Sequence, residues 1–220
     1  EGVKAEEVIC GNGAAEVIFT LCHAVKPKRA LIPAPTFAEY GQALASTGCE
    51  LEYYMLTEND GFVLSEAYLD ILHKGLDMAF LCNPNNPTGM LIPHRLLKRI
   101  LEKCRKLDIL LVVDECFLDF VKEPEEYSLK HSLSGFNNLF ILKAFTKRYA
   151  MAGVRLGYGL CSDRKLMERM ELCVQPWNVS TMAQAAGIQA LTETEYVEEG
   201  RQLVFREAQW LKDELVRIGY

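Results

Sequence analysis

The stretch ILLVVDE, residues 109–115, decides the fold of this 220-residue chain. It is an apolar run, rich in residues that favour strands, and it ends in two carboxylates. A strand that is apolar on both faces is typical of a parallel sheet with helices on either side. MAFLC, residues 78–82, has the same character and runs into the polar segment NPNNPTG, residues 83–89. We therefore expect an α/β fold: three layers, α/β/α, with a mostly parallel central sheet.

Short apolar runs alternate with amphipathic stretches along most of the chain, as expected for such a sheet. Besides the two runs above, the expected strands are residues 29–34, 51–56 and 139–142. The expected helices are residues 13–25, 37–46, 65–73 and 95–106, followed by helical structure from residue 165, with a long polar helix at about 193–217. There is no internal repeat, so residues 1–220 are interpreted as one domain.

Composition excludes several classes of function. A hydrophobic fraction of 50% supplies a core, while a formal net charge of −6 with dispersed basic residues argues against a nucleic-acid partner. No apolar run reaches the roughly 18 residues of a membrane span, so no membrane partner is expected. The eight cysteines form no CxxC pair. Reduced thiols in a cytoplasmic protein are favoured over disulfides, and no metal site is expected.

Polar residues that follow the parallel strands should converge at one edge of the sheet, where open α/β sheets bind ligands. Asp114 ends an apolar strand, where a buried carboxylate needs a cation; a helix cap or an ion pair is the structural alternative. Lys147 alone would be a solvated charge. However, its small and apolar neighbours would desolvate the amine and favour a nucleophile that forms a Schiff base.

A second group of residues is suited to binding a phosphate. In GNGAAE, residues 11–16, Gly13 opens a helix whose free N–H groups attract an anion, although GNG by itself is more often only a turn. Arg155 offers a bidentate guanidinium, and the Thr146 hydroxyl stands beside Lys147. A Schiff-base lysine, an acidic partner for a ring nitrogen and a phosphate cradle together indicate pyridoxal 5'-phosphate (PLP).

Five motifs in order, GNGAAEVI, PTFAEY, NPNNPTG, VVDECF and TKRYAMAGVRLGY, resemble the fold-type I PLP enzymes of the class I/II aminotransferase group, from about residue 11 to residue 191. The resemblance implies Lys147 as the catalytic lysine that bonds the cofactor and Asp114 as the partner of its ring nitrogen. It implies that Asn86 binds the ring hydroxyl, that Phe37 stacks on the ring and that Pro87 follows a cis peptide bond. It also implies a set of phosphate-binding positions, namely Gly13, Ala14, Ala15, Thr146 and Arg155.

Two branches of the group compete. PTFAEY, DECFLDF and QPWNVS look most like threonine-phosphate decarboxylase, an enzyme of cobalamin side-chain synthesis, whereas histidinol-phosphate aminotransferase shares the overall motifs. Phe117 occupies a position where many aminotransferases have a tyrosine, and phenylalanine has no donor for the ring oxygen. Ala144 likewise replaces a common phosphate-binding serine. Trp177 in QPWNVS is consistent with a substrate pocket or with packing in an interface or core.

The resemblance also sets expectations for the whole protein. The substrate would be a small amino acid or amine phosphate, and the likeness implies a homodimer. The chain starts without methionine and ends just after a helix, so it reads as the PLP-binding large domain of an enzyme whose N-terminal arm and C-terminal small domain lie outside these residues. A PLP-binding domain without catalytic activity is the alternative from another class.

Overall fold

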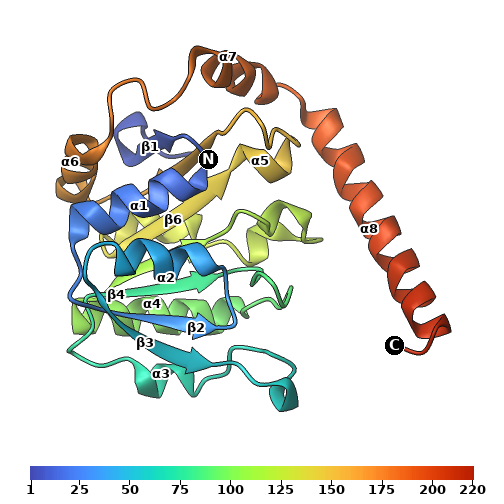
Figure 1. The fold of residues 1–220 in the computed structure, drawn as a ribbon, viewed down its shortest axis with the longest axis horizontal. Helices are drawn as coiled ribbons and strands as arrows, with labels where there is room; N and C mark the ends of the chain where they lie inside the picture. Colours follow the sequence, from blue (N-terminus) through green and yellow to red (C-terminus); the bar gives the residue numbers. More distant parts are fainter.

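A seven-stranded sheet forms the centre of the computed structural model, which describes all 220 residues (Figure 1). Across the sheet the strands follow the order β1-β7-β6-β5-β4-β2-β3. Their bounds are β1 (Val8–Gly11), β2 (Arg29–Ala34), β3 (Glu50–Met55), β4 (Met78–Cys82), β5 (Leu110–Asp114), β6 (Leu139–Ala144) and β7 (Gly157–Leu160).

The expected mostly parallel sheet is confirmed. Strands β2 to β6 pair in parallel, and only β7, which pairs with β6 on one side and β1 on the other, runs against them. Strands β1 and β7, which have four residues each, were not predicted. Strand β7 reads GYGL and lacks the β-branched signature of a strand because its glycines serve close packing. A Cβ at Gly159 would lie 2.1 Å from Cζ of Phe140.

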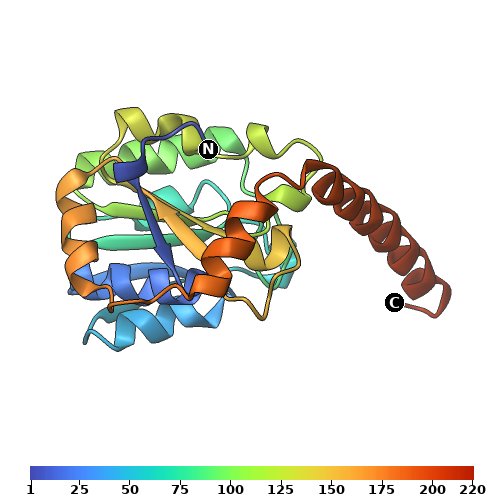
Figure 2. The same cartoon turned by 90° about the horizontal axis from the view of Figure 1, so that it is seen from above.

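Helices cover both faces of the sheet, which gives the expected three layers (Figure 2). Helices α1, α2 and α6 contribute to one buried core, and α3 and α4 contribute to the other. The remaining helices, α5, α7 and α8, follow β6 and β7 in the chain. The bounds are α1 (Ala14–Val25), α2 (Ala38–Ala45), α3 (Tyr68–Ile71), α4 (His94–Leu107), α5 (Phe145–Arg148), α6 (Arg164–Cys173), α7 (Thr181–Ala190) and α8 (Thr194–Arg217).

The alternation of side chains along the central strands assigns each residue to one of the two cores. In β5, Val112 belongs to the core under α1 and α2, and Val113 belongs to the core under α4. The alternation continues at the end of the strand, because Asp114 contacts Tyr40 of the first core and Glu115 contacts Leu129 of the second. The end of the strand therefore presents two adjacent carboxylates to two different environments.

Helix α4 shows why the local sequence folds as it does. Its buried residues recur at helical spacing, namely Leu96, Leu97, Ile100, Leu101 and Cys104. Two basic residues, Arg105 and Lys106, lie in its last turn, where they complement the negative end of the helix dipole. The helix ends at Asp108, which is left-handed with φ 62°.

Two expected helices differ from the observed structure. A helix is expected over residues 65–73, but only Tyr68–Ile71 form one, and its N-cap is Ala67. The short helix buries Tyr68 and Leu69, and it ends at Leu72, where the backbone becomes extended. The helical region expected from residue 165 is also interrupted, because residues 174–180 form the connection between α6 and α7.

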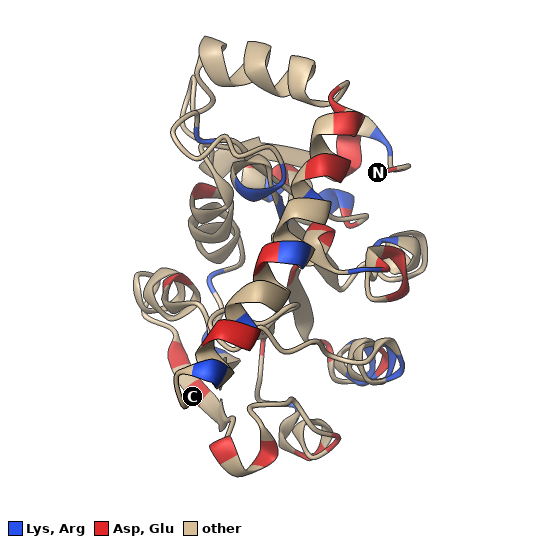
Figure 3. Ribbon diagram, turned by 90° about the vertical axis from the view of Figure 1, so that its right-hand side faces the viewer, with Lys and Arg blue, Asp and Glu red and all other residues tan.

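Helix α8 was expected as a long polar helix and extends away from the body of the molecule (Figures 1 and 2). Figure 3 shows acidic and basic residues distributed along its length. None of its residues is buried, and it also exposes large apolar side chains such as Trp210 and Val216. Arg201 ties it to the body by donating to the carbonyl oxygens of Val121 and Lys122 at 3.0 and 3.1 Å. None of the helices combines the length and apolar character that crossing a membrane requires.

Candidate active site

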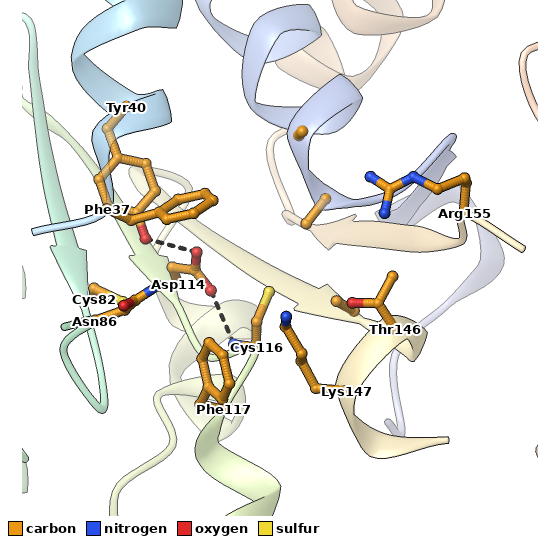
Figure 4. Close-up of a pocket in the computed structure, with 13 residues that line it drawn as sticks. Phe37, Tyr40, Cys82, Asn86, Asp114, Cys116, Phe117, Thr146, Lys147 and Arg155 are labelled. Atoms are coloured by element: carbon orange, nitrogen blue, oxygen red, sulfur yellow. Dashed lines mark hydrogen bonds between the residues drawn. The ribbon is translucent and has the colours of Figure 1, made fainter. Parts of the chain in front are cut away.

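A pocket opens at the carboxyl ends of the parallel strands, with about 600 Å3 of space that is partly open to solvent (Figure 4). Loops after β1, β2, β4, β5 and β6 all contribute to it, as expected for an open α/β sheet. The lining residues are Ala14, Ala15, Phe37, Tyr40, Cys82, Asn86, Asp114, Cys116, Phe117, Ala144, Thr146, Lys147 and Arg155.

Nine of the ten predicted site residues line this pocket. The tenth, Gly13, lies directly behind it, because a Cβ at this position would be 2.5 Å from Nη2 of Arg155. The structure thus brings together residues that are up to 142 positions apart in the sequence (13 to 155). Their roles toward a ligand remain predictions.

Three further lining residues were not predicted: Tyr40, Cys82 and Cys116. Each has a weak signal in the sequence. Tyr40 lies three residues after Phe37 at the start of α2, a spacing that places two side chains on one face of a helix. Cys82 is the last residue of β4, and Cys116 follows Asp114 at the alternate position that returns to the same side.

Asp114 is buried, with 5% of its surface exposed, and holds no cation. Its Oδ2 accepts a hydrogen bond of 2.6 Å from the Tyr40 hydroxyl, and its Oδ1 accepts one of 2.9 Å from the N–H of Cys116 (Figure 4). No basic side chain forms an ion pair with it. A buried carboxylate without a cationic partner is energetically unfavourable, so this end of the pocket is suited to a ligand that carries a positive charge.

The negative charge of Asp114 helps to raise the pKa of three neighbouring groups. Burial and the nearby Asp114 raise the pKa of the Tyr40 hydroxyl well above its usual range. Burial, followed by the charge of Asp114, also raises the pKa of the Cys82 thiol to about 12, and the same two causes raise the pKa of the Cys116 thiol. All three groups therefore stay protonated and uncharged at neutral pH, and none of them neutralises the charge of Asp114.

Glu115, the next residue, lies in a different environment. It is completely buried and forms an ion pair of 3.0 Å with Lys143, whose surface is 7% exposed. The Ser128 hydroxyl donates to Oε2 of Glu115 at 2.8 Å, and the N–H of Leu129 donates to Oε1 at 2.9 Å. Burial alone would lower the pKa of Lys143, but Glu115 and other carboxylates more than offset this, so the pKa is raised.

The opposite end of the pocket is suited to an anion. The first N–H groups of α1 have no partners within the helix, and Gly13, with φ 83°, turns the chain into it. Strand β7 passes so close that a Cβ at Gly157 would lie 2.3 Å from the backbone N of Ala14. Arg155 completes this end from a left-handed backbone with φ 61°, an uncommon conformation that is found at functional sites.

Neither pocket cation is neutralised within the protein. The Arg155 guanidinium makes one hydrogen bond, of 3.3 Å to the Ala152 carbonyl oxygen, and pairs with no carboxylate. Lys147 also forms no ion pair, and its Nζ stands 5.2 Å from the centre of the Phe117 ring. Arg148, next to Lys147, differs because it pairs with Asp119. The free amine and the free guanidinium both remain available to a ligand.

The turn that carries Asn86 is held rigidly. Asn85 donates to the Pro35 carbonyl oxygen at 3.1 Å and to the Thr88 hydroxyl at 2.9 Å, and it accepts from the Thr36 hydroxyl at 2.7 Å. The cis bond expected before Pro87 is present, and two further cis bonds precede Pro35 and Pro84. Asn86 is thereby presented at the edge of the pocket with its side chain free of these bonds.

Trp177 lies outside the pocket. Its side chain is 96% exposed, which rules out the core, and its backbone is left-handed with φ 58°. The adjacent Asn178 fixes the loop to the start of α1 by donating to the Cys10 carbonyl oxygen at 3.1 Å and to Glu16 at 2.9 Å. The loop is therefore anchored next to the anion-binding end, while the indole points away from the protein.

The donor set defines the kind of ligand that fits. One end provides an anion-binding helix terminus with Arg155, the middle provides an amine and the other end provides a buried carboxylate without a cation. A group that carries a phosphate, an aldehyde and a protonatable ring nitrogen satisfies all three. PLP has these three features.

The chain matches the family described as aminotransferase class I and II over residues 2–220, and it belongs to this family of enzymes. The family depends on PLP, the cofactor indicated by the sequence and by the donor set of the pocket. A threonine-phosphate decarboxylase of Salmonella typhimurium is 41% identical over 98% of this chain and 57% of its own length. A histidinol-phosphate aminotransferase of Anoxybacillus flavithermus is 30% identical over 90% of this chain and 53% of its own length.

Solved structures agree with this assignment. The crystal structure of the histidinol-phosphate aminotransferase from Clostridium acetobutylicum superimposes with a TM-score of 0.89 at 28% identity. The superposition covers 97% of this chain and 63% of the other. The chain therefore spans about three fifths of the length of the relatives that it matches.

Proposed function

We propose that these residues form the cofactor-binding large domain of a PLP-dependent enzyme that decarboxylates an amino acid phosphate ester, L-threonine-O-3-phosphate or a close analogue. The observation that carries the proposal is the pocket in which Asp114, Lys147 and Arg155 stand free of other ions. The 41% identity to a threonine-phosphate decarboxylase supports the choice of substrate. The large-domain assignment is supported by relatives that are longer than this chain.

Each pocket residue has a distinct task in this proposal. When bound, PLP supplies an electron sink for the bond that breaks at the substrate's α-carbon. Arg155, Thr146 and the start of α1 at Gly13, Ala14 and Ala15 would hold its phosphate. Asp114 would keep a proton on its ring nitrogen, and Phe37 and Asn86 would hold its ring.

Lys147 is the proposed catalytic residue. Its amine would hold the cofactor at its aldehyde group, and its Nζ would carry a proton to or from the substrate's α-carbon. Orientation of the substrate selects the bond that breaks, so most of the machinery is common to decarboxylation and amino transfer. An aminotransferase that acts on histidinol phosphate is therefore the second candidate, favoured by the 0.89 TM-score to such an enzyme.

Phe117 favours the decarboxylase. Its ring lies beside Lys147 and carries no hydroxyl that could donate a hydrogen bond to the cofactor's ring oxygen. A missing donor changes the protonation of nearby groups.

A PLP-binding protein without catalysis is the third candidate, and it predicts cofactor binding with no turnover of either substrate.

The test uses the full-length protein loaded with PLP and supplied with threonine phosphate. Release of carbon dioxide with aminopropanol phosphate supports the decarboxylase, whereas formation of a keto acid, and activity with histidinol phosphate as donor, supports the aminotransferase. Lys147→Ala is the control and should abolish either reaction. Absence of bound-cofactor absorbance in the unmutated protein would contradict the proposal as a whole.

We also propose that the enzyme works as a homodimer in the cytoplasm. The region from α6 to α7 exposes several large apolar side chains, namely Leu172, Trp177, Met182, Ile188 and Leu191, and such surfaces mark interaction sites. The eight unpaired cysteines suit a reducing compartment. Sedimentation of the full-length protein measures the oligomeric state, and a monomer at micromolar concentration would contradict the dimer.

A further inference from the structure

One side chain, that of Tyr40, holds the Asp114 carboxylate from the protein side. Tyr40 is fully buried, and its hydroxyl donates to Oδ2 of Asp114 at 2.6 Å, across 74 positions of sequence. The other carboxylate oxygen accepts from the backbone N–H of Cys116. Tyr40 is thus the one side-chain donor that Asp114 has.

The ring of Tyr40 is fixed as firmly as its hydroxyl. It stacks on Phe80, with ring centres 5.0 Å apart and planes at 19°, and it makes a T-shaped contact with Phe37, with centres 5.5 Å apart and planes at 71°. Tyr40 therefore contacts both Asp114 and Phe37, the residue proposed to stack on the cofactor's ring.

The direction of the Tyr40 hydrogen bond is also fixed. Burial, together with the charge of Asp114, raises the pKa of Tyr40 well above its usual range, so the phenol keeps its proton and donates at every physiological pH. The neighbouring Cys82 thiol points its hydrogen to the Pro84 carbonyl oxygen at 3.2 Å. A hydrogen bond donated to a carboxylate favours its charged form.

We propose that Tyr40 is a positioning residue for the reaction, which acts through Asp114 by holding the carboxylate ionised and turned toward the pocket. The inference rests on the proposed function. The Asp114 carboxylate and the cofactor's ring nitrogen would be two bases that compete for one proton, and the proton stays on the stronger base. By stabilising the anion of Asp114, Tyr40 leaves this proton on the ring nitrogen, where the electron sink requires it.

The test compares Tyr40→Phe with Tyr68→Phe in the full-length protein loaded with PLP. Tyr68 is the matched control because it is also fully buried, yet its hydroxyl has no hydrogen-bond partner and it lies in the core on the opposite face. In Tyr40→Phe we expect kcat to fall about 10- to 100-fold, the range for a hydrogen bond to a charged group, with KM little changed. Tyr68→Phe should match the unmutated protein.

A spectroscopic readout separates this role from a structural one. In Tyr40→Phe, the midpoint of the pH-dependent change in visible absorbance of bound PLP should move to higher pH. The reason is that a positive ring nitrogen no longer opposes protonation of Lys147 Nζ. In an Asp114→Asn background, Tyr40→Phe should shift the midpoint no further, because Tyr40 acts only through the carboxylate.

Site-specific replacement of Tyr40 by 3-fluorotyrosine keeps the shape of the ring and strengthens the donor, so it predicts the opposite shift, to lower pH. An unchanged midpoint in both Tyr40 variants, or an equal shift in Tyr68→Phe, would overturn the inference while leaving the PLP site intact. If the unmutated protein shows no bound-cofactor absorbance, the proposed function itself fails, and this inference fails with it.

Discussion

Asp114 and Glu115 are adjacent in the sequence and buried to nearly the same extent, yet the protein treats their charges in opposite ways. Glu115 faces the core beneath α4 and is neutralised by Lys143 at 3.0 Å, with two further donors. Asp114 faces the pocket and receives two neutral donors and no cation. This difference is the basis of the proposal that a ligand supplies the missing cation of Asp114, whereas Glu115 is neutralised within the fold.

The largest expected effect concerns stability on the Glu115 side. Glu115→Gln leaves the Lys143 ammonium buried without its counterion, and we expect the free energy of unfolding to fall by about 3–5 kcal/mol. Urea unfolding monitored by circular dichroism measures this. The double variant Glu115→Leu with Lys143→Met removes both charges and should recover most of the loss. Equal stability of Glu115→Gln and the unmutated protein would remove the contrast between the two carboxylates.

The matching change on the pocket side should spare the fold and remove function. Asp114→Asn is expected to lower kcat of the PLP-loaded protein by about 10²–10³-fold, the size found when one preorganised electrostatic partner is lost. Unfolding free energy should stay the same or rise, because an unpaired buried charge is gone. Asp108→Asn, at an exposed left-handed position that asparagine tolerates, is the control. A strongly destabilised Asp114→Asn would show that the carboxylate is structural.

Arg155 tests the other end of the pocket. Arg155→Lys keeps the charge but loses the fork of N–H donors, and we expect the dissociation constant of PLP to rise about ten-fold. Fluorescence titration of the apoprotein with PLP measures it. Arg148→Lys is the matched control, since Arg148 pairs with Asp119 and should affect stability rather than cofactor affinity. Identical affinities in the two variants would show that Arg155 does not bind the phosphate.

The smallest expected effect is on the pH dependence of stability. It concerns two buried thiols, Cys82 on the pocket side and Cys104 on the Glu115 side. Burial raises the pKa of both to about 12, with a further contribution from Asp114 at Cys82. An unfolded thiol has a pKa of about 8.5, so the stability from each protonated thiol is complete below that pH. It is lost as pH rises toward 12, by about 1.4 kcal/mol per pH unit for each thiol.

Urea unfolding at pH 7.5 and 9.5 measures this alkaline loss. Cys104→Ala and Cys82→Ala should each reduce the pH dependence by the share of one thiol, and Cys173→Ala, at an exposed position, should leave it unchanged. In Asp114→Asn, the folded Cys82 thiol should ionise at a lower pH, so the alkaline loss from Cys82 should begin at the same pH and level off at a lower one. Stability that is flat from pH 7.5 to 9.5 would contradict this account of the buried thiols.

Much of the fold and the site could be predicted from the sequence because the signals are local. Apolar runs that end in polar residues identify the central parallel strands, and motifs such as NPNNPTG place individual residues at the pocket. Strand β7 was not predicted because Gly159 serves a close contact with Phe140 and Gly157 one with Ala14, and GYGL itself specifies neither partner. Helix α3 proved shorter than its pattern suggested.

The unpredicted site residues were missed for the same reason: their contacts are with residues that are distant in the sequence. Tyr40 gains its importance from a hydrogen bond to a residue 74 positions away, and nothing in PTFAEY specifies that partner. The pairing of Glu115 with Lys143 likewise depends on the register of β5 and β6. Sequence patterns report which residues can be buried, whereas the balance of charge at each carboxylate appears only when the strands are placed side by side.

One measurement tests the central claim most directly. Full-length protein is loaded with PLP, reduced with borohydride to make the link between cofactor and amine permanent, and digested for peptide mapping by mass spectrometry. We predict that the added mass lies on Lys147 and is absent from Lys147→Ala, while Lys143, occupied by Glu115, carries none. Modification of a different lysine, or no modification at all, would contradict the assignment of this pocket as the PLP site.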